Sequence, residues 1–500
     1  AADRLTAYNQ WLSYFTAYQQ GSKFDGFATG AQNLPLLYDR LDHYGFSGTI
    51  EVDIGNVTAK SITAYRKLSR SYFQDTDGTP FDIGFTVQDT TQQNFSQELQ
   101  LSAIDNRGLD WQLGAYYNRE TGNELVPSNN RLYIDANRSR VSEAGVKNTS
   151  FALYAQAVYH LSDNLRGTGG IRYTHDTRAI DSKNRLDPSL ALEPLLPGGS
   201  PAQCLLLAPA AGGPVFPNCS YKVATKYDKV TWLISADWRP VENVMVYGSI
   251  STGYRAGGLT WQGSTAVQPT VAALEAVYTP FLPESVTNYE IGFKADLFDR
   301  RVRLNGAAFY QDYKDIQARV RDVVDGFPVQ LFRNAAKATL YGGELELTAR
   351  PTDGLTLSAN VAYLHAKYDT FRALDAAGNL LDLSSRPYAS PKWTYNLGAT
   401  YEFPVKSGTI QLTGNFAWIG ANNLSEDVDD AVGAVQEGYG LLDARISWHI
   451  DSMKLDLAVF GKNLTDRRYQ TSANNYGPNG YYVGTFGDPR TWGVQVRKTF

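Results

Sequence analysis

Apolar side chains occur at every second position in segment after segment of this chain. Between residues 91 and 104, for example, Phe95, Leu99 and Leu101 alternate with polar residues. This period of two is typical of β-strands with one apolar and one polar face. It predicts an all-β fold of about seventeen strands, at residues 46–54, 57–73, 91–104, 108–120, 147–161, 165–180, 221–238, 244–255, 285–298, 301–319, 330–350, 355–370, 389–403, 409–422, 435–450, 453–463 and 490–500.

The connections between these strands alternate strictly between short polar turns and long irregular segments. Short turns are expected near residues 55–56, 105–106, 162–164, 239–243, 299–300, 351–354, 404–408 and 451–452. Long segments are expected at 74–90, 121–146, 181–220, 256–284, 320–329, 371–388, 423–434 and 464–489. Soluble β-sandwiches and propellers have no reason to place every long loop at one end, whereas outer-membrane barrels have tight periplasmic turns and long external loops.

Composition supports a transmembrane antiparallel β-barrel. Mean hydropathy is only −0.34, and no run of 18 or more apolar residues occurs. A barrel can be polar on average and still span a bilayer. Aromatic residues make up 13 % of the chain, and many end the predicted strands, as in the aromatic rings at membrane interfaces. The alternative, a soluble β adhesin or propeller, would be extracted without detergent.

Charge and motifs exclude several function classes. The 46 Lys and Arg against 51 Asp and Glu give a net charge of −5, which argues against nucleic-acid binding. The five histidines are scattered without metal-ligand spacing, and no nucleophile elbow, P-loop or dinucleotide fingerprint occurs. We therefore predict no enzyme activity, no cofactor and no metal site. An acidic run at residues 426–430 could coordinate calcium but favours a solvated loop.

The two cysteines, Cys204 and Cys219, lie fifteen residues apart in a segment rich in Pro and Gly. If the chain is exported, one disulfide closing an external loop is the expected arrangement.

Several motifs in chain order resemble the carboxy-terminal part of TonB-dependent outer-membrane receptors. The strongest runs from Pro283-Glu284 through residues 288–294 and 304–310 to residues 313–317. Residues 253–258, residues 463–466 with Tyr469, and the closing strand from residue 489 are similar to other features of the family. Phe500 is similar to the terminal aromatic residue by which the assembly machinery recognises such barrels, although Lys498 departs from the usual apolar pattern.

This resemblance implies a 22-stranded barrel filled by an amino-terminal plug domain. We expect residues 1–45 to form an external loop or a partial strand, and residues 46–500 to form the barrel. The plug domain, the TonB-box segment and the first strands have no counterpart in the sequence. The odd total of predicted strands agrees with missing strands, because bacterial single-chain barrels have even strand numbers. We expect that the chain alone does not transport actively.

The implied function is high-affinity uptake across the bacterial outer membrane of a scarce large solute, most readily a ferric siderophore. Uptake of cobalamin, haem, an oligosaccharide or an aromatic compound, and a passive channel, are the alternatives. The implied partners are the TonB–ExbB–ExbD complex, acting through the plug, outer-membrane lipid and lipopolysaccharide, and a small iron chelate.

Side chains near the external strand ends are the candidate ligand contacts. Arginine offers bidentate recognition of an anionic chelate, and aromatic residues offer rigid contact area. Each could instead pair with a carboxylate or a lipopolysaccharide phosphate, or pack one loop on another. The predicted binding residues are Tyr254, Arg255, Trp261, Arg319, Arg333, Tyr481, Tyr482 and Arg490.

Overall fold

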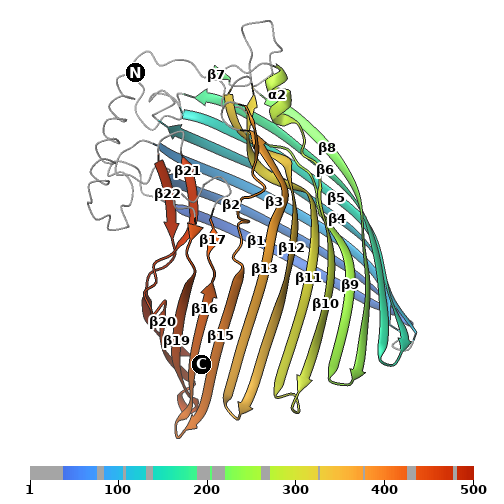
Figure 1. Ribbon diagram of the computed structural model, residues 1–500, viewed down its shortest axis with the longest axis vertical. Coiled ribbons are helices and arrows are strands. Elements are labelled where there is room, and N and C mark those ends of the chain that lie inside the picture. Colours follow the sequence, from blue (N-terminus) through green and yellow to red (C-terminus); the bar gives the residue numbers. More distant parts are fainter. Residues whose placement is uncertain are drawn as a thin grey trace.

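The chain folds into one curved antiparallel sheet, in which each long strand pairs with its neighbours in the sequence (Figure 1). The computed structural model describes residues 38–75, 84–104, 108–130, 139–187, 203–204, 220–260, 271–324, 327–374, 378–424, 435–476 and 481–499. No helix in these ranges is long and apolar enough to cross a membrane. The sheet contains 19 strands, of which β7 and β14 have only two and three residues.

All seventeen strands predicted from the period of two are present. In pairing order they are β1 (Asp39–Ile54), β2 (Val57–Asp75), β3 (Gly84–Ala103), β4 (Leu109–Asn130), β5 (Ser139–Ser162), β6 (Leu165–Asp187), β8 (Ser220–Val241), β9 (Val244–Arg255), β10 (Glu284–Leu297), β11 (Val302–Val324), β12 (Phe327–Thr352), β13 (Leu355–Leu374), β15 (Trp393–Val405), β16 (Gly408–Ile419), β19 (Tyr439–Ile450), β20 (Leu455–Lys462) and β23 (Thr491–Lys498).

Six short strands accompany these seventeen; two of them belong to the large sheet and four form two separate two-stranded sheets. They are β7 (Gln203–Cys204) beside β6, β14 (Leu380–Asp382) beside β13, the pair β17 (Asn422–Asn423) and β18 (Val435–Gln436), and the hairpin β21 (Gln470–Tyr476) and β22 (Tyr481–Phe486). A helix, α2 (Val271–Tyr278), follows β9, and a 3-10 turn, η5 (Asp451–Met453), precedes β20.

Several predicted long loops are shorter than expected, because the strands continue into them. β3 begins at Gly84 instead of residue 91, β4 ends at Asn130 instead of residue 120, and β6 ends at Asp187 instead of residue 180. The sequences of these extensions are mostly polar, so they carry little alternation, yet their backbones remain paired with neighbouring strands over most of their length. The first strand likewise starts at Asp39, inside the segment assigned to a loop or partial strand.

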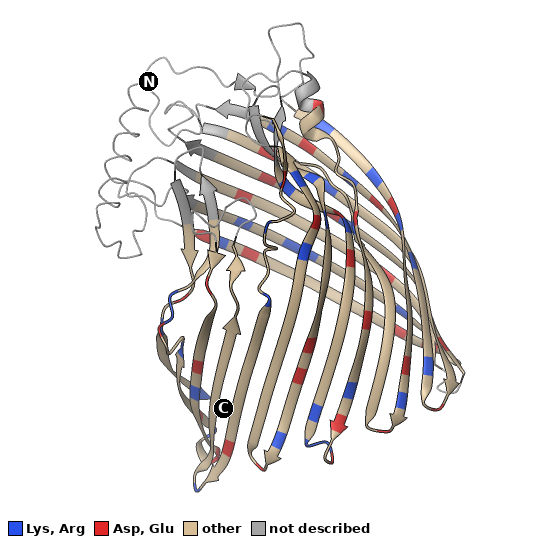
Figure 2. Cartoon of the chain, in the orientation of Figure 1, with Lys and Arg blue, Asp and Glu red and all other residues tan. Residues whose placement is uncertain are grey.

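The two faces of the sheet differ in chemistry over the lower part of each strand. Leu113, Tyr117, Phe151, Leu153 and Tyr173 are 38–50 % exposed and share one face. The opposite face carries hydrogen-bonded polar residues, such as the Tyr154 hydroxyl that donates to Glu98 Oε1 at 2.6 Å. An exposed apolar face against a polar one is the pattern of a barrel wall between lipid and lumen. Figure 2 shows many of the charged residues near the strand ends.

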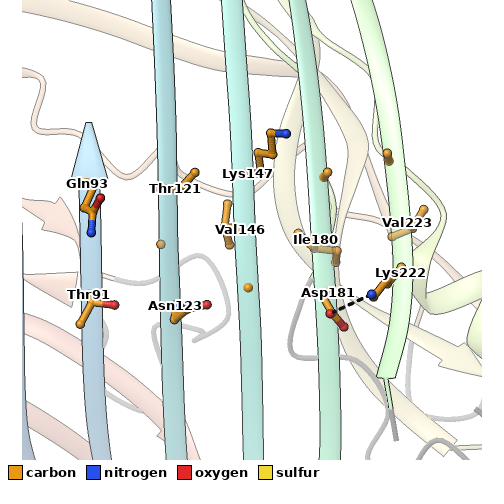
Figure 3. Close-up of a pocket in the computed structure, with 14 residues that line it drawn as sticks. Thr91, Gln93, Thr121, Asn123, Val146, Lys147, Ile180, Asp181, Lys222 and Val223 are labelled. Atoms are coloured by element: carbon orange, nitrogen blue, oxygen red, sulfur yellow. Dashed lines mark ion pairs between the residues drawn. The ribbon is translucent and has the colours of Figure 1, made fainter. Parts of the chain in front are cut away.

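Strand register places the residues of the external extensions in rows that cross several strands. One row on the lipid-side face runs Gln93, Thr121, Lys147, Ala179 and Ala224 across β3, β4, β5, β6 and β8 (Figure 3). The next row outward runs Thr91, Asn123, Gly145, Asp181 and Lys222 on the same strands. Neighbours in a row share a face because side-chain direction alternates along every strand.

The buried apolar clusters lie in the external extensions, beyond the aromatic row of Tyr289, Tyr310 and Tyr341. One cluster is built on β11, β12 and β13 and contains Ala318, Val320, Ala336, Ala338, Leu340, Tyr368 and Phe371. A second joins Ile180, Val277, Tyr278 and Leu331. These clusters hold the external ends of the strands together where lipid no longer covers them.

Candidate functional site

The external end of β9 is tied to the chain just before β10 by a very close backbone approach. Gly258 and Phe281 exchange backbone hydrogen bonds of 3.2 and 3.1 Å. A Cβ atom on Gly257 would lie 2.1 Å from the Phe281 carbonyl oxygen and 2.5 Å from the Tyr227 ring. Only glycine therefore fits at position 257. The resembling motifs at 253–258 and 283–317 thus meet in space.

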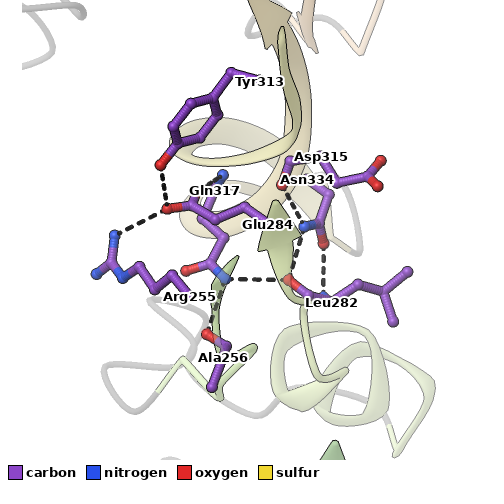
Figure 4. Close-up of polar contacts among 8 residues, drawn as sticks. All are labelled: Arg255, Ala256, Leu282, Glu284, Tyr313, Asp315, Gln317 and Asn334. Carbon is purple, nitrogen blue, oxygen red and sulfur yellow. Dashed lines mark hydrogen bonds and ion pairs between the residues drawn. The ribbon is translucent and has the colours of Figure 1, made fainter. Parts of the chain in front are cut away.

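Glu284, the first residue of β10, is the centre of a polar network at this junction (Figure 4). The residue is only 5 % exposed. Its Oε2 accepts a 2.7 Å hydrogen bond from the Gln317 backbone amide, and its Oε1 accepts one of 3.1 Å from the Tyr313 hydroxyl. Its Oε1 also lies 3.8 Å from Nη1 of Arg255. A buried carboxylate needs such partners, and here two hydrogen-bond donors and one cation supply them.

The network also fixes an irregular part of β11. The pairing of β11 with β12 shifts register between Tyr313 and Gln317, and Asp315 adopts a left-handed conformation with φ of 55°. Asn334 of β12 donates from Nδ2 to the carbonyl oxygens of Leu282 and Asp315, both at 2.8 Å. The Gln317 side chain donates to the carbonyls of Ala256 and Leu282 at 2.9 and 3.1 Å. The bond to Asp315 satisfies a carbonyl of the bulge, and the other bonds satisfy carbonyls of the segment between β9 and β10.

Arg255 is held at the rim of this network with most of its surface free. Its side chain is 68 % exposed, whereas that of Glu284 is 6 % exposed. Glu284 lies on the lumen side, since it alternates with the lipid-side residues Tyr289 and Ile291. Burial and the neighbouring Glu284 carboxylate raise the pKa of Tyr313 to about 12, so this hydroxyl stays protonated as a donor. Arg255 therefore offers most of its guanidinium donors to an anion in the lumen.

Tyr254 makes a second long-range link, from β9 to β6. Its hydroxyl donates a 2.6 Å hydrogen bond to Oδ2 of Asp176, which is 3 % exposed. Arg178 lies 3.4 Å from the other carboxylate oxygen. Burial, together with the Asp176 carboxylate, raises the pKa of Tyr254 above its ordinary value. Tyr254 thus makes a structural contact with the buried Asp176 carboxylate, and its hydroxyl hydrogen is used in that contact.

Helix α2 packs on the sheet beside this junction. Tyr278 is 1 % exposed, stacks on Tyr221 with ring centroids 4.6 Å apart, and donates to the Ser182 hydroxyl at 2.8 Å. Arg333 Nη2 donates to the Ala276 carbonyl in the last turn of the helix at 2.9 Å. A cation at a helix carboxy terminus is stabilising. The helix therefore links β6 and β8 to β12 at the external mouth.

The other predicted arginines do not join Arg255 in one site. Arg333 is engaged with α2, and its cross-strand neighbour is Ala318. Arg319 pairs in register with Phe332, which is 38 % exposed, so it lies on the opposite face from Arg333.

Arg490 belongs to a separate turn, between β20 and β23. Its backbone amide donates to Asp466 Oδ1 at 3.2 Å, and its guanidinium lies 3.7 Å from Oδ2. Asn463, which is 5 % exposed with φ of 47°, donates from Nδ2 to the carbonyls of Arg467 and Asp488 at 2.9 and 3.1 Å. Its Oδ1 accepts from the Arg467 amide at 2.8 Å. The motif at 463–466 is therefore a structural corner.

Some predicted residues lie outside the described part of the chain. Trp261, Cys219 and Phe500 are in this group, as is the acidic run at 426–430, so the disulfide and the assembly signal stay predictions. The backbones of Tyr481 and Tyr482 belong to β22, where they pair with Tyr476 and Asn475. The backbone of Cys204 pairs with Arg185.

The most consequential residues of the mouth were not among the predicted site residues. The sequence indicates Glu284 and Gln317 only as members of a motif, and it does not indicate Asp176 or Asn334. A carboxylate in a predicted strand or directly before one, as at Asp176 and Glu284, is the signal that could have found two of them.

Comparison with known proteins decides the family. The family described as "TonB dependent receptor-like, beta-barrel" matches residues 1–475. The chain belongs to this family of outer-membrane barrels. The similar proteins named below are receptors and not enzymes. The lipid-side and lumen-side faces are accordingly those of an outer-membrane wall.

Curated relatives of this receptor barrel are similar over most of the chain. The pesticin receptor of Yersinia pestis is 25 % identical over 407 residues, which cover 81 % of this chain and 51 % of that protein. The catecholate siderophore receptor Fiu of Escherichia coli O6:H1 is 24 % identical over 416 residues, covering 81 % and 50 %. The chain thus spans about half the length of the curated relatives it matches.

Among solved structures, the ferric yersiniabactin uptake receptor FyuA from Yersinia pestis superimposes with a TM-score of 0.71 at 20 % identity. The match covers 93 % of this chain and 62 % of that one. At this identity the likeness shows the fold alone.

Proposed function

We propose that the chain is the barrel of a TonB-dependent outer-membrane receptor that takes up an anionic ferric chelate of the siderophore class. The observation that carries the proposal is Arg255, an exposed guanidinium held on the lumen side by a buried carboxylate. A ferric siderophore that presents carboxylate or phenolate oxygens is an anion whose paired oxygens suit the planar guanidinium fork. The name of one relative, a catecholate siderophore receptor, supports the same class.

In this proposal the wall and the mouth have different roles. The Glu284 network keeps the external ends of β9 to β12 in a fixed arrangement, so Arg255 is presented without a large entropy loss on binding. Release of the bound solute into the periplasm would require a plug domain driven by the TonB–ExbB–ExbD complex.

The test is uptake and binding by the complete protein in its own outer membrane. We expect iron-55 supplied as ferric yersiniabactin, a ferric catecholate or ferric citrate to accumulate for at least one of the three, and only when TonB is present. Arg255→Gln should weaken binding of that chelate by about tenfold, because one charge-assisted contact is lost. Lys294→Gln, which removes one cation elsewhere on the lumen side, should not.

A passive channel is the competing function, and conductance separates the two. The complete protein in a planar bilayer should be nearly closed if a plug fills the lumen. Large, stable, ungated conductance without TonB-dependent uptake would contradict the proposal. TonB-dependent uptake of cobalamin, haem, an oligosaccharide or an aromatic compound, with no binding of any of the three chelates, would support the receptor function but contradict the proposed substrate.

A further inference from the structure

The seam between β8 and β9 is paired over only part of its length. The ladder between these strands runs outward from their periplasmic turn and ends where Leu233 pairs with Ser251. Beyond that point residues 220–232 of β8 pair with β6 alone, and residues 252–255 of β9 pair with β10 alone. In Figure 1 strands β1 to β8 cross the view obliquely, whereas β9 to β16 run closer to upright. The sheet thus divides at this seam in its external half.

Side-chain contacts replace the ladder beyond Leu233. The Trp232 backbone amide donates a 2.9 Å hydrogen bond to the Thr252 hydroxyl, and the Tyr254 hydroxyl donates to Asp176 of β6 at 2.6 Å. Within residues 220–260, all of which the structure describes, no backbone pairing joins β8 to β9 outside the ladder. The seams on either side of this one, β6 with β8 and β9 with β10, have continuous ladders at the same level.

The unpaired stretch is bounded at both ends. Inward it stops at the pair of Leu233 with Ser251, and outward it stops where the Tyr227 hydroxyl of β8 donates to the Phe281 carbonyl at 2.8 Å. Along β9 it spans residues 252–255, which is about 13 Å at roughly 3.3 Å per residue. This stretch can therefore open without the loss of either boundary.

The ladder ends at the level of the external aromatic residues. Trp232 and Tyr173, which are 39 % and 41 % exposed, lie on the lipid-side face here. An unpaired strand edge is not tolerated within the hydrocarbon layer, but water and headgroups can satisfy it at the membrane interface, where Trp and Tyr are enriched. The break in pairing thus begins at the first depth that permits it.

The two sides of the seam differ in chemistry. On the lipid side, Ile234 and Ile250 are 63 % and 39 % exposed and face each other across the end of the ladder. On the lumen side lies a cavity of about 430 Å³, whose polar lining residues include Glu98, Gln156, Arg172, Thr231 and Ser251. The Arg172 guanidinium alternates with the lipid-side Ile171 along β6, so it faces the lumen. A path through the seam would join this polar cavity to the bilayer.

We infer that the unpaired stretch is a lateral portal in the wall, which admits the acyl chain of an amphiphilic solute. The polar part of the solute would occupy the lumen cavity, where Arg172 offers a cation and Gln156, Thr231 and Ser251 offer hydrogen bonds. Its acyl chain would pass between Trp232 and Thr252 into the bilayer, and transfer of that chain from water into hydrocarbon favours the arrangement.

The ligand part of this inference deepens the proposed function and rests on it, since the solute would be a chelate that carries an acyl chain. The portal itself rests only on the pairing of β8 and β9. The two parts are therefore tested separately.

The portal is tested by labelling a lumen-side residue from the bilayer. Ser249 and Ser251 are both on the lumen-side face of β9, but Ser249 lies within the ladder and Ser251 at its end. Each is replaced by Cys in the complete protein in nanodiscs, with Cys204 and Cys219 replaced by Ser, and is treated with N-decylmaleimide. We expect Ser251→Cys to react at least about tenfold faster than Ser249→Cys, and faster still with Tyr254→Phe, because only local side-chain contacts have to break.

Two labelling results would overturn the portal. One is an equal rate of decylmaleimide labelling at the two positions. The other is labelling of Ser251→Cys by a charged, water-soluble maleimide as fast as by decylmaleimide, because the reagent would then arrive through the external mouth.

The ligand part is tested with the ferric complex of a synthetic tris-catechol chelator, made with and without one decanoyl chain. The acylated complex should bind the complete protein at least about tenfold more tightly. A disulfide across the seam, from Trp232→Cys with Thr252→Cys, should abolish this preference, whereas one within the paired ladder of β10 and β11, from Asn288→Cys with Gln311→Cys, should keep it. An undiminished preference in the oxidised seam variant would overturn the ligand part. Binding of neither complex would contradict the proposed chelate class, and the labelling rates would still decide the portal.

Discussion

The backbone amide of Gln317 donates a 2.7 Å hydrogen bond to the carboxylate of Glu284, a residue 33 positions earlier in the chain. This bond closes the bulge of β11 against the first residue of β10, and the Tyr313 hydroxyl completes it from the same bulge. Arg255 therefore rests on a carboxylate whose own position is determined by β11. These hydrogen bonds hold the junction at the mouth, and the Arg255 guanidinium is exposed there.

Replacing Glu284 by Gln should destabilise this junction. The Gln317 N–H and the Tyr313 O–H donate to this carboxylate, and the Arg255 guanidinium lies 3.8 Å from it, so an amide NH₂ in place of one carboxylate oxygen would face a donor or a cation. We expect the free energy of unfolding to fall by about 2 kcal/mol, as for the loss of a buried charged hydrogen bond. Urea unfolding of the detergent-solubilised protein measures this. Glu275→Gln on the exposed side of α2 is the matched control and should leave the urea midpoint unchanged.

Tyr254→Phe should cost roughly 1–3 kcal/mol of unfolding free energy, because the buried carboxylate of Asp176 loses a donor. Tyr289→Phe is the control, since its ring is 46 % exposed on the lipid side. The loss of the same oxygen atom there should leave the urea midpoint within error. If both variants unfold at the midpoint of the unaltered protein, the link from β9 to β6 contributes nothing to stability.

The contribution of Tyr313 and Tyr254 to stability should be constant through neutral pH and should fall above about pH 10. The pKa of Tyr313 is raised by burial and by Glu284 to about 12, and that of Tyr254 is raised by burial and by Asp176. A group whose pKa is higher in the folded state favours folding below its unfolded pKa, and the benefit is lost as the pH rises through the folded value. Unfolding midpoints measured across this range should decline towards pH 12, and less steeply in Tyr313→Phe.

Asn463→Asp should weaken the corner between β20 and β23. The substitution keeps Oδ1 and tolerates the left-handed backbone, but it places a carboxylate oxygen against the carbonyls of Arg467 and Asp488. We expect a loss of roughly 1–3 kcal/mol, seen as a lower temperature at which the folded barrel loses its fast migration in an unheated gel. Asn396→Asp in β15, whose cross-strand neighbours are the uncharged Asn360 and Ala417, serves as the control. A thermal transition equal to that of the unaltered protein would show that the corner is held by other contacts.

The sequence predicted the strands well and their external limits poorly, for one physical reason. Apolar and polar residues alternate where one face of a strand contacts lipid, as at Phe95, Leu99 and Leu101. The alternation disappears where both faces contact water. From Thr86 to Gln93 the residues are mostly polar, so only backbone pairing with β2 and β4 reveals the strand. Pairing of that kind is a property of two segments together and is not visible in either one.

The site was predicted in part, for a related reason. Arg255 can be predicted as a ligand contact from the sequence, because it lies at a strand end, where few structural contacts are expected. Glu284 and Asp176 are important because they are buried, which the sequence does not show. Burial depends on α2, the bulge of β11 and the approach of Gly257 to Phe281, which join segments far apart in the chain. Arg333 and Arg490 were plausible for the same reason as Arg255, and only their contacts with Ala276 and Asp466 show that they have structural roles.

The meander of the sheet has a consequence for how the wall is built. Each long strand pairs with the long strand before it in the chain, and the tightest turns join strands such as β1 and β2 or β5 and β6. The loop-closure entropy is therefore small for each hairpin with a two-residue turn, even in a sheet of 19 strands. Growth can proceed one hairpin at a time, with the previous strand as template, and a fault in one hairpin would stall all the strands that come after it.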